Sequence, residues 1–115
     1  MAEYAIFIYE DEESMSALEP AEFDDVIKGH EAFIQENAAI LRGGNALQPP
    51  STATTIRKDP SGGYTMTDGP FGGVTQALGG YYIIDVGDLD EALAVAKQVP
   101  APTGGVEVRS VRVFE

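Results

Sequence analysis

Two segments of the chain are apolar or aromatic at nearly every position. They are Tyr4–Tyr9 and Tyr81–Val86. A strand with one face in water alternates between apolar and polar residues, whereas an uninterrupted apolar run is typical of a strand buried on both faces. The pattern therefore predicts two central β-strands in a sheet that is covered on both sides.

A longer segment shows helical periodicity. Between Pro20 and Leu41 the apolar side chains recur on one face, and Pro20 suits the first turn of a helix. We expect Gly43-Gly44 to end this helix, because glycine readily adopts the left-handed conformation that closes many helices. The acidic segment before the helix, Glu10–Ser16, is predicted to be a solvated loop.

A second helix is predicted at Asp88–Val99. Asp88 is the expected N-cap, and Glu91 follows three residues later, as in a capping box. The dipeptide Gly79-Gly80 precedes the second apolar strand, where it permits a β-bulge or the close approach of another backbone. Both glycines are therefore predicted to be structural.

Shorter strands are predicted in the rest of the chain. A hairpin is expected from Thr52–Arg57 and Tyr64–Thr67, a short strand at Asn45–Leu47, and a last strand at Val106–Phe114 with a bulge or a change of environment at Ser110. With the hairpin as an addition, the order of elements is βαββαβ. That order is typical of an α+β domain with an antiparallel sheet and two helices on one face.

The predicted sheet leaves a packing problem. Two helices cover one face, yet the two central strands direct large apolar side chains to both faces. A second apolar face in water would form a patch larger than the few hundred Å² that a monomer usually exposes. Another copy of the chain is the simplest cover, so the pattern predicts a homodimer joined through its sheet faces.

Composition narrows the class of protein. The 115 residues fit a single domain, residues 1–115. A net charge of -12 disfavours nucleic acid and anionic membrane surfaces as partners. No apolar run reaches the roughly 20 residues of a membrane span, and the start of the chain does not resemble a signal peptide. The sequence therefore predicts a cytoplasmic protein.

Few residues are suited to chemistry. There is no cysteine, so disulfides and thiolate sites are excluded, and one histidine makes a metal site unexpected. The chain has no phosphate loop, dinucleotide fingerprint or nucleophile elbow, and we expect no cofactor. The histidine, His30, lies on the apolar face of the first helix, where it is either a structural residue or a general acid or base. Arg57 and Arg109 either hold an anionic ligand or pair with carboxylates.

Several motifs together resemble the DGPF-domain proteins of the YCII-related family. They are Asp68-Gly69-Pro70-Phe71, Leu78–Asp85, Asp88–Ala92 and Val106–Arg109. The resemblance spans the whole chain and implies a ferredoxin-like fold that dimerises as an α+β barrel. It also implies a His/Asp pair in a cleft, and the matching residues are His30 and Asp68.

The family pattern leaves two functions open. The first is a small-molecule enzyme of lyase, isomerase or hydrolase-like type that uses His30 and Asp68 as an acid/base pair. The second is a non-catalytic ligand-binding or regulatory module that uses the same dimer cleft. The family usually has a Glu and a Lys after the DGPF run, whereas this chain has Gly72–Gln76, which favours the second function. Asp68 also has a structural alternative, since Asp before Gly-Pro commonly caps a turn.

Overall fold

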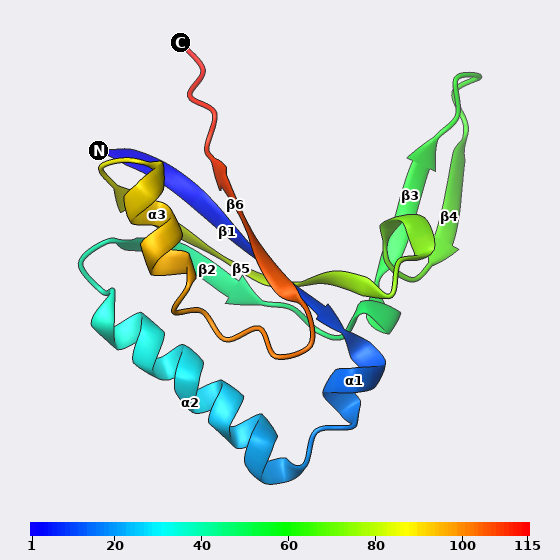
Figure 1. Cartoon of the computed structure of the whole chain (residues 1–115). Helices are drawn as coiled ribbons and strands as arrows, with labels where there is room; N and C mark the ends of the chain where they lie inside the picture. The colour runs from blue at the N-terminus through cyan, green and yellow to red at the C-terminus, as the bar shows by residue number, and fades with distance from the viewer.

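A four-stranded antiparallel sheet forms the centre of the molecule (Figure 1). The computed structural model describes all residues from Met1 to Glu115. The strands of the sheet lie in the order β2-β5-β1-β6, and their bounds are Leu41–Ala46, Gln76–Val86, Ala2–Asp11 and Gly105–Ser110. All neighbouring strands are antiparallel. This order, with a helix after the first strand and another before the last, is the ferredoxin-like α+β fold, which confirms the predicted fold class.

Helices α2 (Pro20–Glu36) and α3 (Leu89–Ala96) pack on the same face of this sheet. Alternate residues of β1 and β5 point toward them, and Ile6 and Ile84 are completely buried there. Phe33 from α2 and Ala92 from α3 complete the core from the helix side. The predicted periodicities of strand and helix therefore place their apolar residues against one another.

The other face of the sheet also carries apolar side chains. Phe7 lies opposite Tyr81, and Ala5 lies opposite Ile83, in the antiparallel register of β1 and β5. The side chains of Phe7, Tyr81 and Ile83 are only half-buried in the single chain. Apolar residues on both faces were predicted, but one chain covers only the helix face. We call the second surface the open face.

A two-stranded arm extends away from the main sheet (Figure 1). Its strands are β3 (Thr54–Lys58) and β4 (Tyr64–Asp68), and the 3-10 helices η1 (Pro50–Thr52) and η2 (Phe71–Gly73) flank them. Ile56 pairs with Met66 across the arm, and both side chains are exposed. The predicted hairpin is confirmed.

The acidic segment near the N-terminus differs from its prediction as a loop. Residues Glu12–Ser16 form a short helix, α1. The carboxylate of Asp11 accepts a hydrogen bond from the backbone N–H of Ser14, at 3.0 Å, and acts as N-cap. The negative charges of Glu12 and Glu13 in the first turn interact favourably with the positive end of the helix dipole. The acidic residues therefore begin a helix instead of only solvating a loop.

Helix α2 ends earlier than predicted, at Glu36 instead of Leu41. Asn37 is its C-cap, and the Asn37 side-chain amide donates to the carbonyl oxygen of Phe33. The prediction that Gly43-Gly44 ends the helix is wrong, because both glycines lie within β2. A Cβ at Gly44 would lie 2.7 Å from the carbonyl oxygen of Tyr81, so this glycine permits the close approach of β2 and β5.

Other elements also have bounds that differ from the prediction. The short strand predicted at Asn45–Leu47 is β2, Leu41–Ala46. Strand β6 stops at Ser110 instead of Phe114, so Ser110 marks the end of regular pairing. Helix α3 ends at Ala96 instead of Val99, and Asp88 is its N-cap, with a carboxylate oxygen 2.9 Å from the backbone nitrogen of Glu91. The Glu91 carboxylate accepts from the N–H of Gly87 and not from that of Asp88, so only half of the expected capping box forms.

The glycine pair before the second apolar run has the predicted structural role. The register of β1 and β5 shifts between Ile8 and Tyr9, opposite Gly79, which is a bulge. A Cβ at Gly80 would lie 3.0 Å from the backbone oxygen of Asn45 on β2. The chain has no helix of the length and apolar character needed to span a lipid bilayer.

Candidate functional site

A cleft of about 660 Å³ lies between α2 and the end of the main sheet. Helix α2 contributes one side of it, and β1, β2 and β5 contribute the floor. The segment Pro100–Thr103, which follows α3, and helix α1 close its rim. About half of the lining residues are apolar, and His30 lies among them. The cleft is large enough for a small organic molecule.

His30 projects from α2 toward the central strand β5. Its Nδ1 lies 2.8 Å from the hydroxyl oxygen of Tyr82, and the centroids of the two rings are 5.9 Å apart. The ring of Tyr82 packs in turn on Phe33, at 4.6 Å between centroids. Tyr82 therefore supplies the polar partner that a partly buried imidazole needs.

Burial shifts the pKa values of His30 and Tyr82 so that the uncharged form of each side chain is favoured. Desolvation lowers the pKa of His30 below its ordinary value of 6.5 and raises the pKa of Tyr82 above 10.0. At neutral pH the imidazole is therefore uncharged and the phenol keeps its proton. Either the Tyr82 hydroxyl donates to Nδ1, or Nδ1–H donates to the hydroxyl and leaves the lone pair of Nε2 free. In the second tautomer His30 has the properties of a general base.

Asp68 lies elsewhere in the molecule. It is the last residue of β4, opposite Thr54 on the arm, and it is exposed. Its carboxylate forms no hydrogen bond or ion pair within the chain, and it does not line the cleft that contains His30. A single chain thus brings His30 to Tyr82 and does not bring it to Asp68. The pairing of His30 with Asp68 stays a prediction.

The two arginines that were candidates for ligand binding also lie outside this cleft. The guanidinium of Arg57 stacks over the ring of Phe71 at the base of the arm, 4.3 Å from its centroid. Arg109 lies on the open face, where its Nε donates to the carboxylate of Glu107 at 2.8 Å. The hydroxyl of Tyr9 donates to the same carboxylate. Arg109 therefore forms the kind of ion pair that the sequence left open as the alternative.

Tyr82 was not predicted as a site residue. The sequence analysis included it only in the apolar run Tyr81–Val86, which is predicted to be a buried strand. A usable signal was present, since alternation places Tyr82 on the same face as Ile84 and His30 lies on the inward face of the helix that covers it. The contact between these two residues depends on how α2 sits along β5, which the periodicity of neither element determines.

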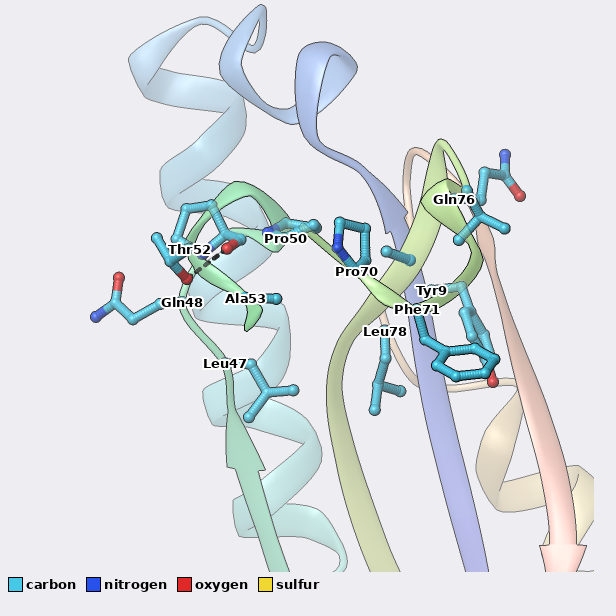
Figure 2. Close-up of a pocket in the computed structure, with 13 residues that line it drawn as sticks. Tyr9, Leu47, Gln48, Pro50, Thr52, Ala53, Pro70, Phe71, Gln76 and Leu78 are labelled. Atoms are coloured by element: carbon cyan, nitrogen blue, oxygen red, sulfur yellow. Dashed lines mark hydrogen bonds between the residues drawn. The ribbon is translucent and has the colours of Figure 1, made fainter. Parts of the chain in front are cut away.

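A second cavity, of about 510 Å³, lies at the base of the arm. Figure 2 shows apolar side chains contributed by three segments: Leu47 after β2, Phe71 in η2 and Leu78 in β5. None of its thirteen lining residues is charged. Four of them also line the cleft of His30: Tyr9, Leu47, Gln48 and Pro49. The two cavities share these four residues, but the side chain of Tyr9 lies on the open face, where it meets Glu107, whereas His30 lies on the helix face.

The charged residues that line the main cleft are all acidic. Its ionisable lining residues besides His30 and the tyrosines are Glu10, Glu12 and Glu31, and no lysine or arginine lines it. Burial, followed by the nearby charge of Glu12, raises the pKa of Glu10. The chain contains no group of three or more side chains placed to hold a metal ion. The ionisable groups that line the cleft are thus one imidazole, three phenols and three carboxyl groups.

Comparison with known proteins agrees with the fold. Residues 2–115 match the family model of the YCII-related domain. An uncharacterized protein of Rhizobium meliloti (strain 1021) is 31% identical over 116 residues, which cover 97% of this chain and 94% of that protein. The match extends over the sheet, both covering helices, the arm and the segments that line the cleft. The chain belongs to the YCII-related family.

Proposed function

We propose that this protein is a small-molecule enzyme of acid/base type whose substrate occupies the cleft beneath α2. The observation that carries the proposal is the position of His30, the one histidine of the chain, which lines this cleft uncharged and hydrogen-bonded to Tyr82. An uncharged imidazole can accept a proton from a substrate held beside it. The reaction class is a proton transfer of lyase, isomerase or hydrolase-like type.

In this proposal the phenol of Tyr82 is a positioning residue. When Nδ1–H donates to the Tyr82 oxygen, the ring of His30 is held in one orientation and Nε2 presents its lone pair to the cleft. Asp68 keeps its predicted role as a carboxylate partner of His30. Because Asp68 lies on the arm, that contact requires either movement of the arm or the arm of a second copy. The anion-binding roles predicted for Arg57 and Arg109 concern surfaces outside the cleft.

A second candidate function is ligand binding without catalysis. Two observations favour it: His30 has no carboxylate hydrogen-bonded to it within the chain, and Gly72–Gln76 lacks the charged pair usual in the family. A non-catalytic module would use the same cleft, with His30 and Tyr82 as hydrogen-bonding groups for the ligand. Turnover separates the two functions, whereas binding is common to both.

We also propose that the working molecule is a homodimer joined through its open faces. The apolar residues Phe7, Tyr81 and Ile83 on this face, which no helix of the chain covers, support the proposal. The run Asp68-Gly69-Pro70-Phe71 supports placement in the DGPF subgroup of the family, and that resemblance implies an α+β barrel formed by two chains.

A fragment screen by NMR tests the proposed function. The imidazole signals of the single histidine report directly on the cleft, so we expect a subset of fragments to shift them. Hits are then incubated with wild type, His30→Gln and Glu13→Gln, the last being an exposed control outside both cavities. Product that forms with wild type and Glu13→Gln but not with His30→Gln supports an enzyme, and binding without product supports the second candidate. If no fragment shifts His30, the cleft is not the functional site.

A further inference from the structure

Glu10 lies on the helix face of the sheet, near the end of β1. Strand β1 keeps its regular alternation here, because the extra residue of the bulge, Gly79, belongs to β5. Ile6 and Ile8 point into the core beneath the helices, so Glu10 points to the same side. It lines the cleft that contains His30 and does not line the cavity at the base of the arm. A dimer joined through the open faces therefore leaves Glu10 accessible.

A glycine determines where the carboxylate of Glu10 lies. The Cα of Glu10 is opposite Ala77, yet its carboxylate lies against Gly79, where a Cβ would be 2.7 Å from either carboxylate oxygen. The side chain therefore extends along β5 in the direction of Tyr82. Any residue other than glycine at position 79 would fill the space that the carboxylate occupies.

The carboxylate of Glu10 receives no hydrogen bond from the chain. The neighbouring carboxylate of Glu12, by contrast, accepts hydrogen bonds from the backbone N–H and the hydroxyl of Ser51. Burial, followed by the charge of Glu12, raises the pKa of Glu10, and no donor lowers it. Partly buried polar groups in proteins usually have a hydrogen-bond partner. The donor for Glu10 therefore has to come from outside the chain.

Bare backbone separates Glu10 from the pair formed by His30 and Tyr82. Gly79 and Gly80 both line the cleft, and neither has a side chain. Burial alone shifts the pKa of His30, so no carboxylate is in contact with the imidazole. A small molecule that lies over the two glycines would contact His30 at one end and Glu10 at the other, and the cleft of about 660 Å³ is large enough to hold it.

We infer that Glu10 determines the specificity of the cleft: its carboxylate accepts a hydrogen bond from a hydroxyl or amine group of a small molecule that lies over Gly79 and Gly80 and reaches His30. The inference rests on the proposed function and names its substrate class, a hydrogen-bond donor. A donor that meets a carboxylate forms a charge-assisted hydrogen bond, which is among the strongest in proteins. A ligand with acceptors alone leaves Glu10 without a partner.

Three matched probes test the preference for a donor. They are 2-phenylethanol, 2-phenylethylamine and 2-phenylethyl methyl ether, which share one body, and only the ether lacks a donor. Each is titrated into the full-length wild type while NMR follows the side-chain carboxyl carbon of Glu10 and the imidazole of His30. We expect the alcohol and the amine to shift both signals together and to bind about tenfold more tightly than the ether. Equal or tighter binding of the ether overturns the inference.

Variants of Glu10 separate its carboxylate from the rest of the cleft. Glu10→Met removes the acceptor at similar length and should weaken the alcohol and the amine about tenfold while the ether is unchanged. Glu10→Gln keeps an acceptor oxygen without the charge, so a loss confined to the amine identifies a cationic donor, and equal small losses identify a neutral one. Glu36→Met is the control, since Glu36 is exposed on α2 outside both cavities. An equal loss in Glu36→Met, or no loss in Glu10→Met, overturns the inference.

Gly79→Ala tests the position of the carboxylate without a change at Glu10. The added Cβ would take the space of the carboxylate, which is the free end of a flexible side chain and can move aside while the fold is kept. We expect the alcohol and the amine to lose their advantage over the ether. Gly43→Ala is the matched control in the same sheet, because nothing lies within 4 Å of a Cβ there. An undiminished preference for donors in Gly79→Ala would mean that the Glu10 carboxylate does not contact the ligand.

The outcomes also separate this inference from the proposed function. Probes that shift neither Glu10 nor His30, or that shift His30 without Glu10, refute the role of Glu10. The proposed function is judged by the fragment screen and by loss of turnover in His30→Gln, neither of which requires Glu10. Turnover that depends on His30 and is unchanged in Glu10→Met would support the enzyme and refute the substrate class inferred for it.

Discussion

The hydrogen bond between His30 and Tyr82 joins the long helix to the central strand. Its atoms, Nδ1 and the hydroxyl oxygen, lie 2.8 Å apart above the packed pair of Tyr82 and Phe33. Each group loses contact with water on folding and regains a partner in the other, which offsets much of the cost of burial. At the scale of single residues, this contact both stabilises the packing of α2 on β5 and orients the imidazole of the proposed reaction.

Removal of one hydroxyl tests the structural part of this contact. Tyr82→Phe keeps the aromatic ring but leaves Nδ1 of His30 without its partner. We expect the free energy of unfolding to fall by about 1–2 kcal/mol, as for other unpaired, partly buried polar groups. Urea denaturation measures it, with Tyr64→Phe as control because that tyrosine is exposed on the arm and its hydroxyl has no partner. Equal stability of Tyr82→Phe and wild type would mean that water satisfies His30 as well.

The titration of His30 tests the pairing with Asp68. Burial places its folded pKa below the ordinary value of 6.5, so the stability that His30 contributes is present above pH 6.5 and is lost as the pH falls through the folded pKa. A nearby carboxylate favours the protonated imidazole, so if the predicted pair forms, Asp68→Asn should lower the pKa of His30 further. NMR reads the midpoint from a single histidine. Identical midpoints in wild type and Asp68→Asn would contradict the pairing.

At the scale of elements, Gly80 permits the close approach of β5 to β2. A side chain at Gly80 would meet the backbone of Asn45 at 3.0 Å and that of Ala46 at 3.4 Å, and backbone cannot move aside cheaply. We therefore expect Gly80→Val to reduce stability by about 1–3 kcal/mol. Thermal unfolding measures the loss. Gly63→Val is the matched control, since nothing lies within 4 Å of its position. A Gly80→Val protein that melts like the control would show that β2 can shift without cost.

The elements that the sequence predicted well are those with a long repeating pattern. The continuous apolar runs of β1 and β5 and the periodicity of α2 extend over enough residues to identify both type and position. Helix α1 has only one turn and buries no residue, so it has no apolar face to detect. The end of α2 depends on one amide, that of Asn37, which reaches both Phe33 and Gln98. Such individual contacts are decided by tertiary structure.

The candidate site was predictable only in part for the same reason. His30 could be singled out because it interrupts an apolar face and is the one histidine. Its partner Tyr82 is fifty-two positions away, and the two meet only because of how α2 crosses β5. The absence of basic residues from the cleft likewise became visible only when the fold brought Glu10, Glu12 and Glu31 together.

At the scale of the whole molecule, the chain is broad and thin. Its extents are 47 × 47 × 18 Å, and its radius of gyration is 16.1 Å. A compact chain of this length should have a radius of about 13 Å. The radius of gyration is larger than this because the arm projects from the sheet and the helices form a single layer. A second chain against the open face would thicken the molecule and cover Phe7, Tyr81 and Ile83.

The proposed dimer is tested by the mass of the protein in solution. We expect light scattering to give twice the chain mass of 12.2 kDa at micromolar concentration, with an interface of about 2,000 Å² or more. Ile83→Glu places a charge at the centre of the open face and should produce monomers. Leu89→Glu adds the same charge at an exposed position where α3 begins and should remain dimeric. A folded wild-type monomer at that concentration would rule out the proposed dimer.

The arm has a further consequence for how the molecule opens. It consists of two strands closed by the Asp59–Gly63 turn and tied at its base by the bond from Gly69 N–H to the carbonyl of Ala53. A two-stranded ribbon on its own is only marginally stable. The arm can therefore unfold without disturbing the four-stranded sheet, and its amide hydrogens should exchange with solvent through this local opening, far sooner than those of β1 and β5. Slow exchange in the arm that depends on protein concentration would instead reveal that a second chain holds it closed.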